Sequence, residues 1–327
     1  MSRFFLTLEI LHDGEPVGVP VGLETPLQLG VEALRWHCVC KGDADFDPEQ
    51  LVVTPVWHKD GEPFVEAIAF AAAGGESTVA LDARRLYSDE ARKTSARLVQ
   101  EEKLKEGDLY DFRIRAQDRG SGATPRLDLL HYEVREGGER PPVGGPRDPD
   151  RADPADGFDV LIDPVVLAEA RRLSRGAGEN ETGGLLGGHL LRESGPSREP
   201  YLHVTVVVPA GGDGERAAFQ FTPEAWNRGR AALEDRGAGE IMCGWFHSHP
   251  PDLCPPTCPP EKRKTCVLRH PFLSGDDLLV HRAAFPAPFN IALLVSDDGE
   301  ERHVPSVWGW RNGVIARRAY HLTKQES

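Results

Sequence analysis

A run of glycine, proline and alternating charges divides this chain of 327 residues into two parts. The run, EGGERPPVGGPRDPDRADPADG, covers residues 136 to 157. Segments of this composition hold too few apolar side chains to form a core and ordinarily serve as linkers. The chain is also long enough for roughly two domains of ordinary size. We therefore predict a first domain over residues 1 to 135, a linker over 136 to 157 and a second domain over 158 to 327.

The first domain has the pattern of a β-rich fold. Short apolar or alternating runs, separated by Gly, Asp and Pro, predict strands at residues 4 to 11, 34 to 39, 51 to 58, 65 to 71 and 108 to 116. Residues 82 to 105 are rich in Arg, Glu, Lys, Leu and Ala and favour a helix. We expect a β-rich or α+β domain, and its residues point to no particular role.

The second domain alternates helices and strands. Pro164 opens a helix in which Val166, Leu167, Ala170 and Leu173 recur at helical spacing. Further helices are predicted to begin at Thr222 and Ser274, and strands are predicted at residues 182 to 191, 202 to 208, 241 to 246 and 291 to 295. This order predicts an α/β fold, in which helices flank a mixed sheet.

The charge and cysteine content of the chain limit its partners and its location. The formal net charge is -14, which argues against a surface for nucleic acid or anionic membranes. No apolar run approaches the roughly 20 residues needed to span a bilayer, and the first residues lack the features of a signal peptide. Six cysteines without an export signal favour a reducing compartment. We expect a cytoplasmic protein that binds neither nucleic acid nor membrane.

The motif His247-Ser248-His249-Pro250 follows the apolar run at residues 241 to 246. Side chains at i and i+2 of an extended chain point to the same side, so the two imidazoles can converge on one point. Asp277 can add a carboxylate from the first turn of the helix that Ser274 opens. Ser274 and Asp277 also have the spacing of a capping box, which by itself would only stabilise the helix start. Two histidines and one carboxylate, with a fourth position left for water, are typical of a catalytic zinc.

A zinc hydrolase also needs a general base, and Glu181 is the candidate. It lies in Glu181-Thr182-Gly183-Gly184, where a polar loop leads into a glycine-rich strand. A carboxylate there can be held beside a metal by the sheet without being a ligand. Taken alone, this short motif would usually be a turn, and its position before the histidine pair makes the combination specific.

These separated pieces together resemble the JAMM, or MPN-plus, metalloprotease family, whose members hydrolyse isopeptide bonds to ubiquitin or ubiquitin-like proteins. The resemblance covers residues of about 158 to 320 and rests on the Glu181 motif, on residues 244 to 250 and on residues 274 to 277. It implies a cytidine-deaminase-like fold, zinc held by His247, His249 and Asp277, and Glu181 as the base. By the same match, Ser274 would help to stabilise the tetrahedral oxyanion.

The resemblance implies hydrolysis of the amide bond after the C-terminal tail of a ubiquitin-like protein, for deconjugation or precursor processing. Proteins similar to ubiquitin-activating and ubiquitin-conjugating enzymes would then be further partners, and the Gly- and Arg-rich, Lys-poor composition indicates a bacterial source. Two alternatives stay open. One is a non-catalytic MPN-type scaffold, although the family's metal-free members lack the ligands. The other is a zinc hydrolase acting on a small-molecule amide.

A cysteine-rich insertion departs from the family pattern, because residues 250 to 276 separate the second histidine from Asp277. Within residues 251 to 270, Cys254, Cys258, Cys266 and His270 form the pattern C-x3-C-x7-C-x3-H. Four such ligands in a loop poor in apolar residues indicate a second, structural zinc. The alternatives are free thiols, a disulfide formed on oxidation, or His281 in place of His270.

The remaining reactive side chains receive structural interpretations. A cysteine protease pairing Cys243 with His247 is disfavoured, because four residues along one strand separate them by about 13 Å. We interpret His189 and His203 as partnered structural residues. The other cysteines and the tryptophans of the second domain are interpreted as packing residues: Cys38, Cys40, Cys243, Trp226, Trp245, Trp308 and Trp310.

Overall fold

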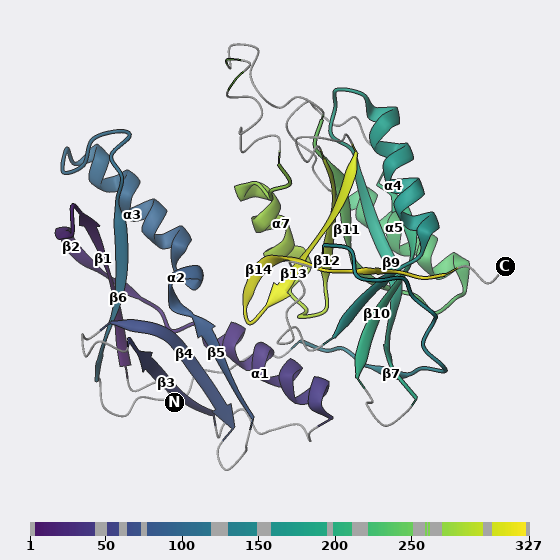
Figure 1. Cartoon of the computed structure of the whole chain (residues 1–327), viewed down its shortest axis with the longest axis horizontal. Coiled ribbons are helices and arrows are strands. Elements are labelled where there is room, and N and C mark those ends of the chain that lie inside the picture. Colours follow the sequence, from purple (N-terminus) through teal and green to yellow (C-terminus); the bar gives the residue numbers. More distant parts are fainter. Residues whose placement is uncertain are drawn as a thin grey trace. The chain divides into compact units, whose positions relative to one another are not determined.

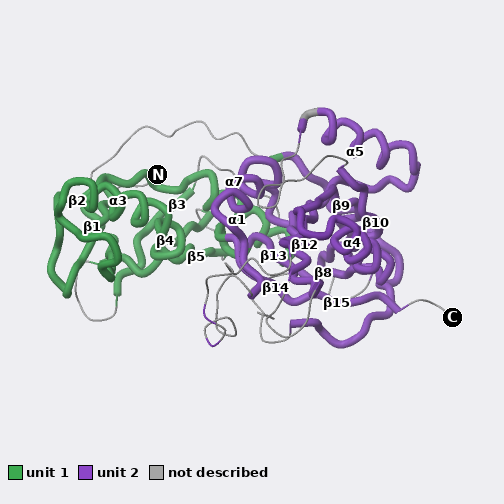
Figure 2. Tube along the Cα trace, turned by 90° about the horizontal axis from the view of Figure 1, so that it is seen from above, with its two compact units in different colours: residues 1–130, 311–314 green, residues 131–310, 315–327 purple. Residues whose placement is uncertain are grey.

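The computed structural model forms two compact units (Figure 2). It describes residues 4–42, 51–58, 64–72, 77–118, 130–148, 158–194, 199–210, 222–250, 259, 261, 270–296 and 303–324. The first unit comprises Met1–Leu130 with Arg311–Val314, and the second comprises His131–Trp310 with Ile315–Ser327. Both units combine helices with β-sheets, so the chain has a mixed α/β architecture in which strands outnumber helices among the described residues.

The first unit contains two antiparallel sheets of three strands each. One sheet has the order β2-β1-β6 and the other the order β3-β4-β5. The strands are β1 (Phe4–His12), β2 (Glu15–Leu23), β3 (Leu51–Trp57), β4 (Val65–Ala72), β5 (Thr78–Asp82) and β6 (Asp111–Asp118), and the helices are α1 (Leu27–Lys41), α2 (Ala83–Leu86) and α3 (Ser88–Gln100). Alternate residues of β1, namely Leu6, Leu8 and Ile10, enter a core that α1 and α3 also line. The strands predicted at residues 4 to 11, 51 to 58 and 65 to 71 are confirmed, and the strand predicted at 108 to 116 is observed at Asp111–Asp118.

The prediction of a strand at residues 34 to 39 was wrong, because this segment lies inside α1. Leu34 and Cys38 fit a strand by alternation, but they also follow Val31 at the helical spacing i, i+3, i+7, and all three are buried. A methyl group on Gly30 would come within 2.1 Å of the Phe70 ring, so glycine allows α1 to pack close to β4. Helical periodicity therefore explains which residues of α1 are buried.

The second unit is built on one mixed sheet, whose strands β9 to β12 lie side by side in Figure 1. The strand order is β14-β13-β12-β11-β9-β10-β8-β15, and β7 also pairs with β9. The strands are β7 (Arg135–Glu136), β8 (Asp159–Ile162), β9 (Gly183–Arg192), β10 (Pro200–Pro209), β11 (Ile241–Ser248), β12 (Ile291–Ser296), β13 (Val304–Arg311), β14 (Val314–Arg318) and β15 (His321–Leu322). The strands β11 and β12 run parallel, whereas β9 is antiparallel to both β10 and β11.

Helices cover this sheet. The helices are α4 (Pro164–Ala177), α5 (Pro223–Arg236) and α7 (Gly275–Ala284). Trp226 of α5 and Phe285 after α7 pack against Leu185 and Trp245 of the sheet, while α4 packs against β10, β11 and β12. Every residue of β12 is buried, as expected for a strand covered on both faces. This agrees with the sheet flanked by helices that the sequence predicts.

The helix starts follow the local sequence. The Thr222 hydroxyl accepts a hydrogen bond from the amide of Ala225 at 3.2 Å, and Pro223 follows the cap. Pro164 likewise stands in the first turn of α4. None of the helices in the described part of the chain is both long enough and apolar enough to cross a membrane.

Part of the segment predicted as a linker is joined to the sheet of the second unit. Glu136 pairs with Arg192, Val143 forms a bridge with Thr323, and Arg147 forms a bridge with Tyr320. Backbone hydrogen bonds therefore attach residues 136 to 148 to the second unit, and they compensate for the shortage of apolar side chains. Residues 149 to 157 lie outside the described residues.

Candidate metal centre

The strand β11 carries both histidines of the candidate site to its carboxyl end. Its register pairs His247 with Gly183 of β9 on one side and with Leu294 of β12 on the other. The amide of His249 donates to the carbonyl of Val295 at 3.0 Å, so pairing with β12 continues past the end of β11. A methyl group on Gly244 would come within 2.1 Å of the Ile291 carbonyl oxygen, so this glycine permits the close approach of β11 and β12. The two histidines therefore sit on a backbone held from both sides.

The helix α7 presents Asp277 to the histidines. The Ser274 hydroxyl accepts from the Asp277 amide at 3.1 Å, and the Ser274 amide donates to Asp277 Oδ2 at 2.7 Å. This pair is the capping box that the sequence predicts. It fixes the Asp277 carboxylate at the start of the helix, with one oxygen bound to the cap.

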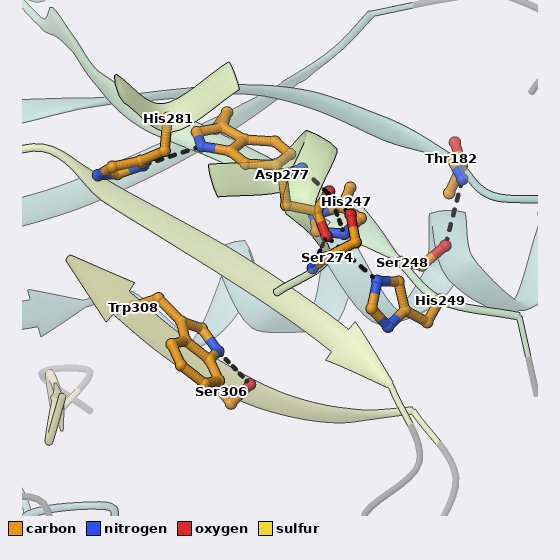
Figure 3. A network of polar contacts seen from close by, with 10 residues as sticks. Thr182, His247, Ser248, His249, Ser274, Asp277, His281, Ser306 and Trp308 are labelled. Atoms are coloured by element: carbon orange, nitrogen blue, oxygen red, sulfur yellow. Dashed lines mark hydrogen bonds and ion pairs between the residues drawn. The ribbon is translucent and has the colours of Figure 1, made fainter. Parts of the chain in front are cut away.

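The side chains of His247, His249 and Asp277 converge, as the i, i+2 spacing predicts (Figure 3). Each of the three offers one ligand atom, and these atoms lie within 4.8 Å of one another. The Nε2 atom of His247 is 3.2 Å from Asp277 Oδ1, and that of His249 is 3.6 Å from Asp277 Oδ2. Both imidazoles are buried. Such a set of two imidazole nitrogens and one carboxylate oxygen matches a zinc site that keeps a position open.

The charges at the site suit a cation. Burial lowers the pKa of His247, although the nearby Asp277 acts in the opposite direction. Burial also raises the pKa of Asp277, but the adjacent imidazoles of His247 and His249 outweigh this effect and hold that pKa well below its usual range. A neutral imidazole beside an ionised carboxylate is the protonation state that metal binding requires.

Unsatisfied nitrogen atoms provide a direct test of whether a metal fits. Within the described residues, neither ring nitrogen of His247 makes a hydrogen bond, and Nδ1 of His249 makes none either. Burying a polar nitrogen without a partner costs free energy, on the order of 1 to 3 kcal/mol. A cation bound between the Nε2 atoms and Asp277 would supply the missing partner to His247 Nε2. The residues present therefore fit a divalent metal with imidazole affinity, such as zinc.

Glu181 directly precedes Thr182, which is hydrogen-bonded to the residue between the two histidines. Its neighbour Thr182 accepts a hydrogen bond from the Ser248 amide at 2.8 Å and donates its own amide to Ser248 Oγ at 3.3 Å. The Ser248 hydroxyl therefore points toward Thr182, as Figure 3 shows. These two bonds hold the segment containing Glu181 against the residue between the two histidines.

Aromatic side chains near the ligands were not assigned to the site from sequence. The Trp245 ring stacks on His247 with a centroid separation of 4.7 Å and an interplanar angle of 12°. The Phe272 ring lies 4.8 Å from that of His249. Trp245 precedes His247 by two residues, so the same-side rule for strands could have placed it next to the ligand. No comparable signal in the sequence identifies Phe272.

Most of the residues predicted to bind a second zinc lie outside the described residues. Cys254, Cys258 and Cys266 lie outside the described residues, whereas His270 lies within them. The alternative ligand His281 is fully buried and accepts a hydrogen bond from Trp245 Nε1 at 3.1 Å. His281 is therefore a packed residue of the second unit.

The structure supports several of the other structural interpretations. Cys243 is fully buried, its Sγ donates to the Leu186 carbonyl at 3.4 Å, and burial strongly raises the pKa of its thiol. A protonated, buried thiol is a poor nucleophile, which argues against a cysteine protease. His203 Nε2 lies 2.7 Å from Asp163 Oδ1, so His203 is partnered as predicted. Trp245 and Trp310 are buried.

Comparisons with known proteins leave the activity open. No family model matches the chain, and no curated protein is similar to it. Among solved structures, a protein from Desulfitobacterium hafniense is 22% identical with a TM-score of 0.34, over 51% of this chain and 94% of that one. A protein from Salinibacter ruber is 20% identical with a TM-score of 0.30, over the same shares of the two chains.

Proposed function

We propose that the second unit is a zinc-dependent peptidase of the JAMM, or MPN-plus, type with a cytidine-deaminase-like fold. The observation that carries this proposal is the convergence of His247, His249 and Asp277, whose ligand atoms lie within 4.8 Å of one another. Glu181 and Ser274 stand at matching positions of the same motifs, which supports this family over other zinc hydrolases. The mixed sheet with helices against it is compatible with such a fold.

His247, His249 and Asp277 would hold the zinc ion. When bound at such a site, zinc lowers the pKa of a water molecule and polarises a carbonyl group. The neutral His247 and the ionised Asp277 leave one net negative charge on this ligand pair, which partly offsets the charge of a divalent cation. The sheet and the capping box hold these ligands before a metal arrives, so little reorganisation is needed.

Two other residues would take part in the reaction: Glu181 would transfer the proton, and Ser274 would stabilise the developing negative charge. Glu181 would take a proton from the attacking water and return it to the leaving amine, which is the work of a general base and then of a general acid. The Ser274 oxygen accepts from the Asp277 amide, so its own hydroxyl hydrogen can be donated to another acceptor. Directed at the substrate carbonyl, this hydrogen would stabilise the oxyanion that forms.

The substrate we propose is an amide bond after the C-terminal tail of a ubiquitin-like protein. The supporting observation is the order and spacing of the three motif segments, which resemble those of enzymes with this activity. In this scheme no serine or cysteine attacks the carbonyl, in agreement with the buried and protonated Cys243. Activating and conjugating proteins of such a pathway would be the partners of this chain.

The base is tested with Glu181→Gln, and Glu179→Gln serves as a matched control because Glu179 is an exposed carboxylate two residues away. We expect Glu181→Gln to keep its zinc and to lose at least about 100-fold in hydrolysis of an amide-linked ubiquitin-like conjugate, since general bases contribute this much. Glu179→Gln should keep full activity. Zinc is measured by atomic emission and hydrolysis by electrophoresis of the released protein.

Several results would contradict the proposal. Full activity of Glu181→Gln would remove the assigned base, and a metal-free unaltered protein would favour the scaffold alternative. Cleavage of small amides without cleavage of any conjugate would favour the small-molecule hydrolase.

A further inference from the structure

Two pairs of side chains connect α7 to β11 at the candidate metal centre. In the first pair, Asp277 Oδ1 lies 3.2 Å from His247 Nε2. In the second pair, His281 Nδ1 accepts a hydrogen bond from Trp245 Nε1 at 3.1 Å. We refer to these as the Asp277 pair and the His281 pair. Figure 3 shows His281 on the same helix as Asp277, with the second contact as a dashed line.

The two pairs have matching geometry. Residues four apart on a helix lie on one side, about 6 Å apart along the axis, and this applies to Asp277 and His281. Residues two apart on a strand lie on one side, about 6.7 Å apart, and this applies to Trp245 and His247. The helix can therefore meet the strand at both pairs at once. A helix held at only one of them could rotate or slide about that contact.

The His281 pair is also joined to the ligand through the Trp245 ring. That ring stacks on His247 with an interplanar angle of 12° and a centroid separation of 4.7 Å. The Nε1–H group of Trp245 is buried, and His281 supplies its acceptor. A buried donor without an acceptor is unfavourable, so this hydrogen bond selects one orientation of the indole. The indole orientation in turn limits the rotation of the His247 ring.

The protonation of His281 suits this role. Burial lowers the pKa of His281 to about 3, so the ring is neutral at ordinary pH. Because Nδ1 accepts from Trp245, the single proton of the neutral ring resides on Nε2. The acceptor is therefore present over the whole pH range in which a zinc hydrolase works.

We propose that His281 and Trp245 are positioning residues for the metal centre, which hold α7 and the His247 ring so that Asp277 and His247 are preorganised to bind zinc. This inference rests on the proposed function of the site. Neither residue touches the metal position, so both act through Asp277 and His247. Partners that orient metal ligands typically contribute about 10- to 100-fold to metal affinity.

The experiment compares two substitutions of nearly equal shape, His281→Leu and His281→Asn. The amide oxygen of Asn can occupy the place of Nδ1 and accept from Trp245, whereas Leu has no acceptor. Both leave the same space where the outer part of the ring was, so any cavity effect is shared. Zinc affinity is measured by competition with a chelator, and the thermal midpoint of the metal-free protein reports on folding.

We expect His281→Leu to bind zinc about 10-fold more weakly than His281→Asn. In a Trp245→Phe background the indole N–H is absent, so the difference between Leu and Asn should disappear. Cobalt in place of zinc gives a second readout, because its visible absorption changes with ligand geometry. A shift of the cobalt bands in His281→Leu, absent in His281→Asn, would support the positioning role.

The outcomes separate this inference from the proposed function. Stoichiometric zinc in the unaltered protein, with equal affinities for His281→Leu and His281→Asn, would overturn the positioning role alone. A difference that persists in the Trp245→Phe background would also overturn it, because His281 would then act by another route. Failure of the unaltered protein to bind zinc would overturn the proposed function and this inference with it.

Discussion

At the scale of single residues, the geometry of the candidate site depends on the hydrogen bonds that its buried polar atoms make. Ser248 is an instance, because it lies between two candidate metal ligands and its hydroxyl is bonded to Thr182. Its amide donates to the Thr182 carbonyl, and its hydroxyl accepts from the Thr182 amide at 3.3 Å. Ser248 therefore connects the strand that carries the histidines to the segment that carries Glu181.

The role of Ser248 gives a prediction for Ser248→Ala. The variant should keep its zinc but lose about 1 kcal/mol of stability, the usual net value of one hydrogen bond. Hydrolysis should fall further than zinc binding, because the loop before β9 is less well held next to the histidines. Urea unfolding, zinc content and hydrolysis rates measure the three effects.

Ser306→Ala is a matched control for this variant. Ser306 is a buried serine of the same sheet whose hydroxyl accepts from Trp308 Nε1 at 3.2 Å. This control should lose similar stability and keep its hydrolysis rate. Equal activities for the two variants, measured at equal folded fraction, would contradict the connecting role of Ser248.

At the scale of elements, the start of α7 combines a structural task with a chemical one. Ser274 and Asp277 cap the helix through two reciprocal hydrogen bonds, and Asp277 is also a candidate ligand. The two tasks are compatible, because the hydrogen bond from the Ser274 amide to Asp277 Oδ2 limits the motion of the Asp277 carboxylate. Helix capping is thus part of the candidate metal site.

Two variants, Ser274→Ala and Ser274→Thr, test whether the Ser274 hydroxyl both caps α7 and positions Asp277. Loss of the N-cap in Ser274→Ala should cost about 1 kcal/mol and weaken zinc binding, whereas Ser274→Thr keeps the hydroxyl and should retain most of both. Calorimetry on metal-free and zinc-loaded protein gives the two quantities. Unchanged zinc affinity in Ser274→Ala would show that the cap does not position Asp277.

The cysteine-rich insertion is the element for which only the sequence makes a prediction. If Cys254, Cys258, Cys266 and His270 bind a structural zinc, the unaltered protein contains two zinc ions per chain. Both Cys258→Ser and His247→Ala should then contain one, and only His247→Ala should lose the catalytic ion. A single zinc ion in the unaltered protein would contradict the second site.

At the scale of the whole molecule, the domain boundary is decided by hydrogen bonds. Residues 137 to 147 have a linker-like composition, yet their backbone bonds to strands of the second unit at several points. The Gly137 amide donates to the Arg192 carbonyl at 2.9 Å, and the Gly144 amide donates to the Leu322 carbonyl at 3.0 Å. The Arg147 amide donates to the Tyr320 carbonyl at 2.7 Å. Residues of this segment therefore contribute to the stability of the sheet.

Two fragments of the second unit test this contribution. A fragment over residues 131 to 327 should be more stable than one over 158 to 327 by on the order of 5 kcal/mol, because the shorter fragment loses at least five backbone hydrogen bonds of about 1 kcal/mol each. Urea unfolding of the two fragments measures the difference. Equal stabilities would show that residues 131 to 157 act only as a linker.

The sequence alone determined the features that depend on neighbours in the chain. The strand at residues 241 to 246, the same-side histidines and the capping box at Ser274 follow from short periodicities and local hydrogen bonding, and the structure has all three. The segment at residues 34 to 39 was misassigned, because its apolar residues fit two periodicities and only packing against Phe70 and its neighbours favours the helix.

Tertiary structure decided every feature that depends on segments distant in the sequence. The pairing of His247 with Gly183 places the segment that follows Glu181 next to the strand that carries the candidate ligands, and this register depends on strand pairing across many residues. The contact of His281 with Trp245 likewise requires α7 to pack on β11. A single sequence shows which side chains can share a face, whereas the packing of sheet and helix determines which faces meet.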